Sequence, residues 1–280
     1  MPNEDNRLPL FDHLLDAPSA FTPEGLIEAV RADRRLPADP APEVCVLDFD
    51  GDLTDWLVAS GHATRWRPWA CFHTSMETVP VDGGRCGVIA RTIGGPYAVL
   101  VAEQLAVSGA RVILGLTSAG RVSPSLSVPS LVVAASAIRD EGTSYHYLPA
   151  AAAVDCNVAL VQTLVEELGG LGLPVATGTV WTTDAPYRET AGQLERHAAR
   201  GVLAVEMQAA SLFAFGAARG VCCGVAAHVT NGGELAEASQ FDKGTHQFSF
   251  EILKAMFRAG QRYLSRLAPL PEKRAQAGIE

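Results

Sequence analysis

The sequence predicts an α/β fold, a single domain built around a mostly parallel sheet. Continuous apolar runs of strand length recur along the chain, as is typical of strands covered on both faces. Helical patterns lie between several of these runs, and such alternation indicates parallel strands joined by helices. With 280 residues, 48% of them hydrophobic and 19% charged, the chain can bury a sizeable core.

Six apolar runs are expected to be strands. They are VCVLDF near residue 45, CGVIA (86–90), RVILGL (111–116), SLVVAA (130–135), VATGTVW (175–181) and CCGVAAHV (222–229). Four patterns are expected to be helices, three of which end near glycine. They are PYAVLVAEQLAVSG, NVALVQTLVEELGG, QAASLFAFGAARG and THQFSFEILKAMFRAGQRYLSRL.

One main domain is expected, because no Gly-, Ser- or Pro-rich linker divides the chain. Residues 1–42 form an N-terminal segment rich in proline and charge, which we expect to pack on the domain or on a partner subunit. Residues 43–265 form the domain, with an irregular aromatic stretch at 61–80, and 266–280 a polar tail.

Composition excludes several classes of partner. A net charge of -9 argues against nucleic acid, and no apolar stretch is long enough for a membrane span. The six cysteines show no metal-ligand spacing, so we expect buried thiols in a reducing, cytoplasmic compartment, with no metal and no cofactor. The ligand is expected to be small.

Glu206 is a carboxylate inside the apolar run VLAVEMQAASLFAFGAARGV (202–221). Burying an ionised carboxylate without partners is costly, so Glu206 either caps or pairs within the core or faces a ligand. Four loops rich in small or polar residues also follow expected strands, where backbone N–H groups can approach an anion or a sugar, although a glycine after a strand more often forms only a turn. They are FDGDLTD (49–55), TIGGPYA (92–98), LTSAGRVSPS (116–125) and TTDAPYRET (182–190).

The order of these loops, with RDEGTSYHY, AVEMQAA and HVTNGGE, resembles the nucleoside phosphorylase superfamily over roughly residues 43–265. Within it, the chain resembles the uridine phosphorylase and hexameric purine nucleoside phosphorylase branch. GDLTD is similar to the family's G-D-P-x-R, TIGGP to G-I-G-G-P, GLTSAG to R-x-G-T-x-G, TTDAPYRET to T-x-D-x-F-Y and AVEMQAA to V-E-M-E-A. The resemblance implies a twisted mixed sheet flanked by helices, and a homodimer or a trimer of dimers.

The resemblance also implies roles for individual residues. Glu206 would be catalytic by stabilising a cationic sugar, which Met207, Gln208 and His13 would help to bind. Gln208 stands where the family has a second carboxylate, and Asn231 stands where the purine enzymes have a catalytic acid. Ala119, Gly120, Pro186 and Tyr187 would flank the base, and Asp184 reads as a structural loop carboxylate.

The nucleophile side departs from the family pattern. The three arginines that bind phosphate in the family align here with Asp55, Gly115 and a residue near Ala70. Gly51 and Ser118 would remain on this side, and Arg91 or Arg121 would have to replace the lost charge. Phosphate as co-substrate fits the family, whereas the missing arginines favour water.

Three functions therefore remain open. The first is a divergent nucleoside phosphorylase that cleaves the N-glycosidic bond of a nucleoside or nucleoside-like compound. The second is a phosphate-independent nucleoside hydrolase. The third is a relative that binds nucleosides without catalysis.

Overall fold

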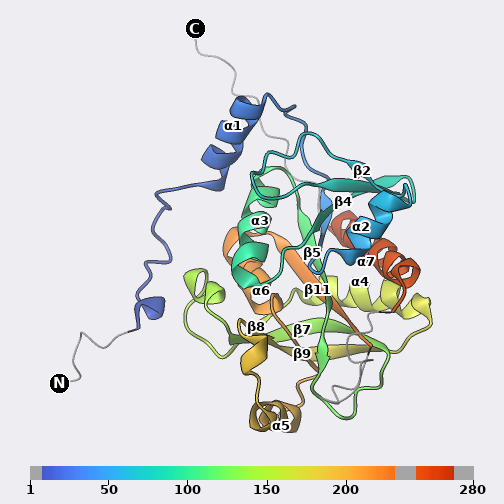
Figure 1. Cartoon of the computed structure of the whole chain (residues 1–280). Coiled ribbons are helices and arrows are strands. Elements are labelled where there is room, and N and C mark those ends of the chain that lie inside the picture. Colours follow the sequence, from blue (N-terminus) through green and yellow to red (C-terminus); the bar gives the residue numbers. More distant parts are fainter. Residues whose placement is uncertain (1–7, 231–243, 268–280) are drawn as a thin grey trace, which may run out of the picture.

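The computed structural model describes residues 8–230 and 244–267 and confirms the α/β fold class. One mixed, mostly parallel sheet of 11 strands forms the centre of a single domain, and helices flank it (Figure 1). The strands are β1 (Val44–Asp48), β2 (Thr64–Arg65), β3 (Glu77–Val81), β4 (Gly84–Ala90), β5 (Val112–Ser118), β6 (Gly120–Arg121), β7 (Ser130–Asp140), β8 (Ala153–Asp155), β9 (Val175–Thr183), β10 (Ala204–Glu206) and β11 (Cys222–Val229).

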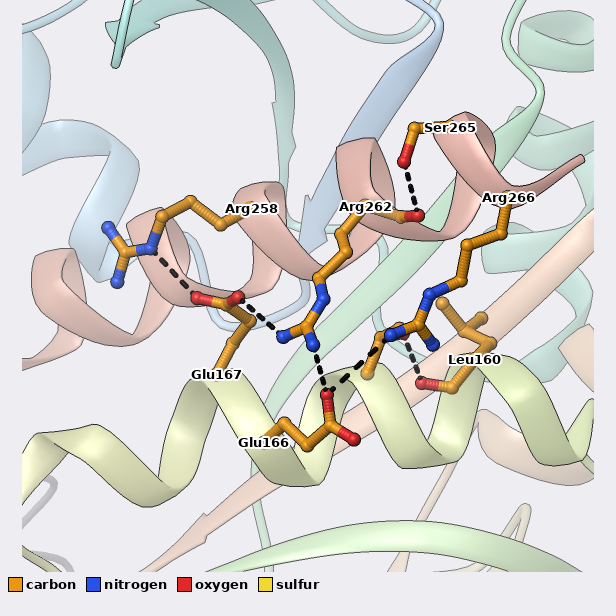
Figure 2. Close-up of polar contacts among 8 residues, drawn as sticks. Leu160, Glu166, Glu167, Arg258, Arg262, Ser265 and Arg266 are labelled. Carbon is orange, nitrogen blue, oxygen red and sulfur yellow. Dashed lines mark hydrogen bonds and ion pairs between the residues drawn. The ribbon is translucent and has the colours of Figure 1, made fainter.

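Seven α-helices occur in the described part of the chain. They are α1 (Pro23–Arg34), α2 (Asp52–Ala59), α3 (Gly95–Val107), α4 (Val158–Leu168), α5 (Ala191–Ala199), α6 (Ala209–Arg219) and α7 (His246–Arg266). Helices α3 and α6 pack together, as do α4 and α7, and both pairs lie against the sheet (Figure 1). Arginines of α7 and glutamates of α4 join the second pair through a ladder of ion pairs (Figure 2).

All six expected strands and all four expected helices are present, within a few residues of the expected bounds. Other elements were not expected from the sequence. Helix α1 lies in the proline-rich segment, where Thr22 accepts a hydrogen bond from the Gly25 N–H and Pro23 opens the helix. The stretch 61–80 is less irregular than expected, because it contains β2 and the start of β3. The two strands pair with each other in an antiparallel register.

The sheet folds back on itself, and this places the site. The strand order is β2-β3-β4-β1-β5-β11-β7-β9-β10-β6, with β8 pairing β7. Strands β5 and β6 are separated in the chain by Ala119 alone, yet β5 lies in the middle of this order and β6 at its end. The chain therefore turns sharply at Ala119, and the end of β5 comes to lie beside β10.

The core confirms the expected state of the cysteines. All six are free thiols, five of them buried and Cys222 half-buried. Among the described helices, none is both long enough and apolar enough to span a membrane.

Candidate functional site

Two groups of strand ends meet at the candidate site. The loops after β4, β1 and β5 lie at one edge of the sheet, because these strands are parallel neighbours. The ends of β7, β9 and β10 form the second group, since β7 runs antiparallel to β11. Two contacts join the groups: Gly120 pairs with Val205, and Gly95 packs directly against Ser211.

Glu206 ends β10, is 4% exposed and caps helix α6 from within the core. Its Oε2 accepts hydrogen bonds from the backbone N–H groups of Gln208, at 2.6 Å, and Ala209, at 2.8 Å. Its Oε1 accepts from the hydroxyl of Thr182 on β9. The geometry thus gives Glu206 the capping role that the sequence left open, at a point next to the loops that the sequence singled out.

The electrostatics of Glu206 are unusual for a carboxyl group. Its pKa is raised to about 7, chiefly by burial and also by the charge of nearby Glu141, while the three hydrogen bonds act in the opposite direction. Neither Glu141 nor Glu206 forms an ion pair with any described residue. These two buried carboxyl groups therefore have no cationic partner among the described residues.

Met207 and Gln208 follow Glu206 at the start of α6. Met207 is half-buried, and its N–H donates to Oε1 of Gln208, which is itself buried. Their position at the strand-to-helix junction agrees with that expected for a sugar site, but their contact with a sugar stays a prediction.

A small acidic recess lies beside the ends of β1, β5 and β11. It has a volume of about 50 Å³, which leaves room for a few water molecules. Burial raises the pKa of Asp48, whose carboxylate accepts from the N–H groups of Gly51 and Thr54. The polar side chains that line the recess are Asp48, Asp50, Asp52, Thr117, Ser118, His228, His246 and Ser249.

Gly51 and Arg91 lie together at this side of the site. Gly51 has a φ of +88°, and a Cβ there would lie 2.6 Å from Cγ of Arg91, so only glycine fits. The guanidinium of Arg91 forms an ion pair with Asp55 of helix α2. Arg91 has thus reached the 51–55 loop, as a replacement arginine should, but a carboxylate already binds it.

Gly115 has no room for a side chain. A Cβ there would lie 2.6 Å from two ring atoms of buried Phe49 and 3.2 Å from Val225. Phe49 therefore fills the space next to the position at which the resemblance expects an arginine. Sequence reasoning missed this, because the contact between Phe49 and Gly115 joins two different strand ends.

The base-side residues divide into two sets. Ala119 and Gly120 are half-buried at the turn between β5 and β6. Pro186 and Tyr187 lie in the short helix η5 (Pro186–Arg188), where the side chain of Tyr187 is 100% exposed, and contact of either residue with a base stays a prediction. Asp184 accepts from the Gly142 N–H at 2.9 Å, which agrees with a structural role for its carboxylate.

The structure places two of the three remaining predicted site residues, Arg121 and His13. Arg121 is in β6, in register with Ala204, and does not reach the acidic recess. The ring of His13 lies 4.0 Å from that of His146 in the same chain. Asn231 lies outside the described residues. No group of three or more described His, Cys, Asp or Glu residues is arranged to hold a metal ion.

Glu141 is a site residue that sequence reasoning missed, although it is part of the RDEGTSYHY stretch. It is 7% exposed, and its Oε2 accepts from the Ser211 hydroxyl at 2.6 Å and from the Ser144 N–H at 2.9 Å. Its Oε1 is buried without a hydrogen-bond partner among the described residues. An acidic residue directly after an apolar strand was the available signal.

A mixed sheet that folds back on itself, with strand-end loops beside the Glu-Met-Gln junction at the end of β10, defines the class as an α/β protein. Comparison with known families then identifies the family: residues 43–258 match the phosphorylase superfamily, and the chain belongs to it.

Similar proteins with assigned names include phosphorylases of different nucleosides. The chain is 28% identical over 163 residues to a uridine phosphorylase of Salmonella typhimurium strain LT2 and 29% identical over 164 residues to one of Escherichia coli strain K12. Each match covers 53% of this chain and 64% of the relative, so the chain spans less than two thirds of these relatives. A guanosine phosphorylase of Halorubrum lacusprofundi is 28% identical over 147 residues, covering 51% of this chain and 59% of that protein.

Proposed function

We propose that this protein cleaves the N-glycosidic bond of a nucleoside or nucleoside-like compound, and that water rather than phosphate is its main nucleophile. Membership of the phosphorylase superfamily supports the first part. The acidic recess supports the second, because three aspartates line the side from which the nucleophile would approach. A phosphate dianion there would need about two or three cationic or charge-assisted donors to offset its desolvation.

In the proposed reaction, the bond between the anomeric carbon and the base nitrogen breaks, and its electron pair leaves with the base. The oxygen of water forms the new bond to the anomeric carbon, and its proton passes to a carboxylate lining the recess. Positive charge develops on the sugar before this bond is complete. Buried carboxylates near the sugar would lower the energy of that cationic state.

Phosphorolysis is the second candidate, and Arg91 is the observation that favours it. Its guanidinium lies over Gly51, so a shift away from Asp55 would bring one cation to the nucleophile side. One arginine is fewer than the resemblance implies for a phosphate site.

The test is incubation of the full chain with a panel of purine and pyrimidine nucleosides, with and without phosphate, followed by chromatography of base and sugar. Free base with unphosphorylated sugar, at a rate nearly independent of phosphate, is the expected result. Sugar 1-phosphate as the sole sugar product would reject water as the nucleophile. Nucleoside binding by calorimetry without release of base would instead identify a non-catalytic relative.

A further inference from the structure

Glu141 connects two parts of the candidate site that are far apart in the sequence. It directly follows β7 and accepts the hydroxyl hydrogen bond of Ser211, in the first turn of α6. Ser211 packs so closely on Gly95 that a Cβ at position 95 would lie 2.1 Å from the Ser211 hydroxyl oxygen. The Glu141–Ser211 bond therefore fixes the first turn of α6 against the loop that follows β4.

The charge of Glu141 is not neutralised by the nearby arginine. Arg139 donates instead to the Ser144 hydroxyl and to the carbonyl oxygens of Leu148 and Pro149. Glu141 acts electrostatically on Glu206 and on Asp184, raising the pKa of both. Its negative charge therefore reaches the junction that carries Glu206, Met207 and Gln208.

We propose that Glu141 is a positioning residue of the sugar site, which holds the start of α6 through Ser211 and supplies the negative charge that Gln208 does not bring. This inference rests on the proposed function. The charge of Glu141 favours the cationic sugar of the transition state over the neutral bound nucleoside, so it acts mainly on kcat. The bond to Ser211 keeps Glu206 and Gln208 in place while that charge develops.

Steady-state kinetics of Glu141→Gln provide the first test. The amide keeps the size of the side chain but removes the charge, so we expect kcat to fall on the order of tenfold or more, with a smaller change in KM. Ser211→Ala keeps the charge of Glu141 and removes only its hydrogen bond from Ser211, so kcat should fall less in this variant. Glu103→Gln is the matched control: Glu103 accepts from Tyr147 and Arg219 near the other end of α6, and its kcat should not change.

A second measurement does not depend on turnover. The carboxyl carbon of Glu206, labelled with ¹³C, is titrated by NMR in the wild type, in Glu141→Gln and in Glu141→Asp. Loss of the neighbouring charge should move the Glu206 midpoint from about 7 to lower pH in Glu141→Gln. Glu141→Asp, which keeps the charge, should stay near the wild-type midpoint and also covers the case in which Glu141→Gln does not fold.

The outcomes separate this inference from the proposed function. An unchanged Glu206 midpoint in Glu141→Gln, or a wild-type kcat in that variant, overturns the role of Glu141 even if nucleosides are cleaved. Equal losses of kcat in Glu141→Gln and Ser211→Ala, with no shift of the midpoint, would reduce Glu141 to a packing residue and also overturn it. A shifted midpoint in a protein that cleaves no nucleoside overturns the proposed function alone.

Discussion

Arg91 and Asp55 form an ion pair whose side chains are both more than half exposed. Exposed ion pairs contribute little to folding stability, because water and salt screen them. The pair matters more for the charge beside Gly51, because Asp55 already binds the guanidinium that lies against Gly51. We therefore expect Asp55 to keep Arg91 from binding an incoming anion.

Asp55→Asn should release Arg91 and make cleavage more dependent on phosphate. The expected result is a larger rise of initial rate with phosphate concentration than in the wild type, with an unchanged melting temperature. Glu43→Gln is the control, because Glu43 pairs with Arg111 at the start of β5, at the other edge of the sheet. Equal phosphate responses in Asp55→Asn and the wild type would contradict a role for Arg91 on the nucleophile side.

At the residue scale, the sequence predicted where an unusual carboxylate lies but not what holds it. An acid at Glu206 is visible in the apolar run, whereas its hydrogen bond from Thr182 depends on the pairing of β9 with β10. The lack of space at Gly115 depends on the ring of Phe49 from another strand end. Contacts of this kind join distant parts of the chain, so local pattern cannot predict them.

At the scale of elements, the clearest polar feature is the ladder between α4 and α7 (Figure 2). Glu167 accepts from Arg258 at 3.1 Å and from Arg262 at 3.3 Å, and Glu166 pairs with Arg262 at 2.8 Å. The N-terminal half of α7 carries His246 and Ser249, which line the acidic recess. The ladder therefore helps to fix one wall of the site.

Glu167→Gln should lower the free energy of unfolding by about 1 kcal/mol, because both arginine contacts lose their charge partner. The loss should shrink at high salt, which screens these half-exposed groups. Chemical denaturation at low and high salt measures both effects. Glu251→Gln is the control, since it breaks a single pair with Lys254 within α7. An equal loss in the two variants at both salt levels would contradict a ladder that joins the helices.

The sequence predicted whether a segment is a helix or a strand where its apolar pattern is long and continuous, as in β11 and α7. It did not predict the short elements. Helix α2 has 8 residues and begins within a loop that the sequence marked for ligand binding. Strand β6 has 2 residues and exists only because β10 lies beside it. Tertiary pairing, rather than local propensity, forms such elements.

At the scale of the whole molecule, large apolar side chains are exposed along the N-terminal segment. Leu14 is 85% and Phe21 72% exposed. The aromatic stretch at 61–80 exposes less apolar surface, because Trp69 is buried and Trp66 half-buried, while Phe72 is 48% exposed. The N-terminal segment is thus the stronger argument for an assembly larger than the monomer.

We expect at least a dimer in solution. Burying the exposed apolar side chains of the N-terminal segment against a second copy would stabilise the dimer through the hydrophobic effect. Sedimentation velocity at several protein concentrations should show a species well above 29.6 kDa. A Phe21→Ser, Leu14→Ser double variant should shift the equilibrium towards the monomer. A monomeric wild type at every concentration would contradict the expectation.

The turn at Ala119 also has a consequence for how the molecule acquires its site during folding. Gly120 and Arg121 pair with Val205 and Ala204, more than eighty residues further along the chain. Contacts between such distant residues form slowly, because the chain loses the entropy of closing a long loop before the contacts stabilise it. We therefore expect the protein to become competent for ligands late in refolding, after most of its helical signal has returned. A nascent chain that stops before β10 would contain all four strand-end loops but no finished site.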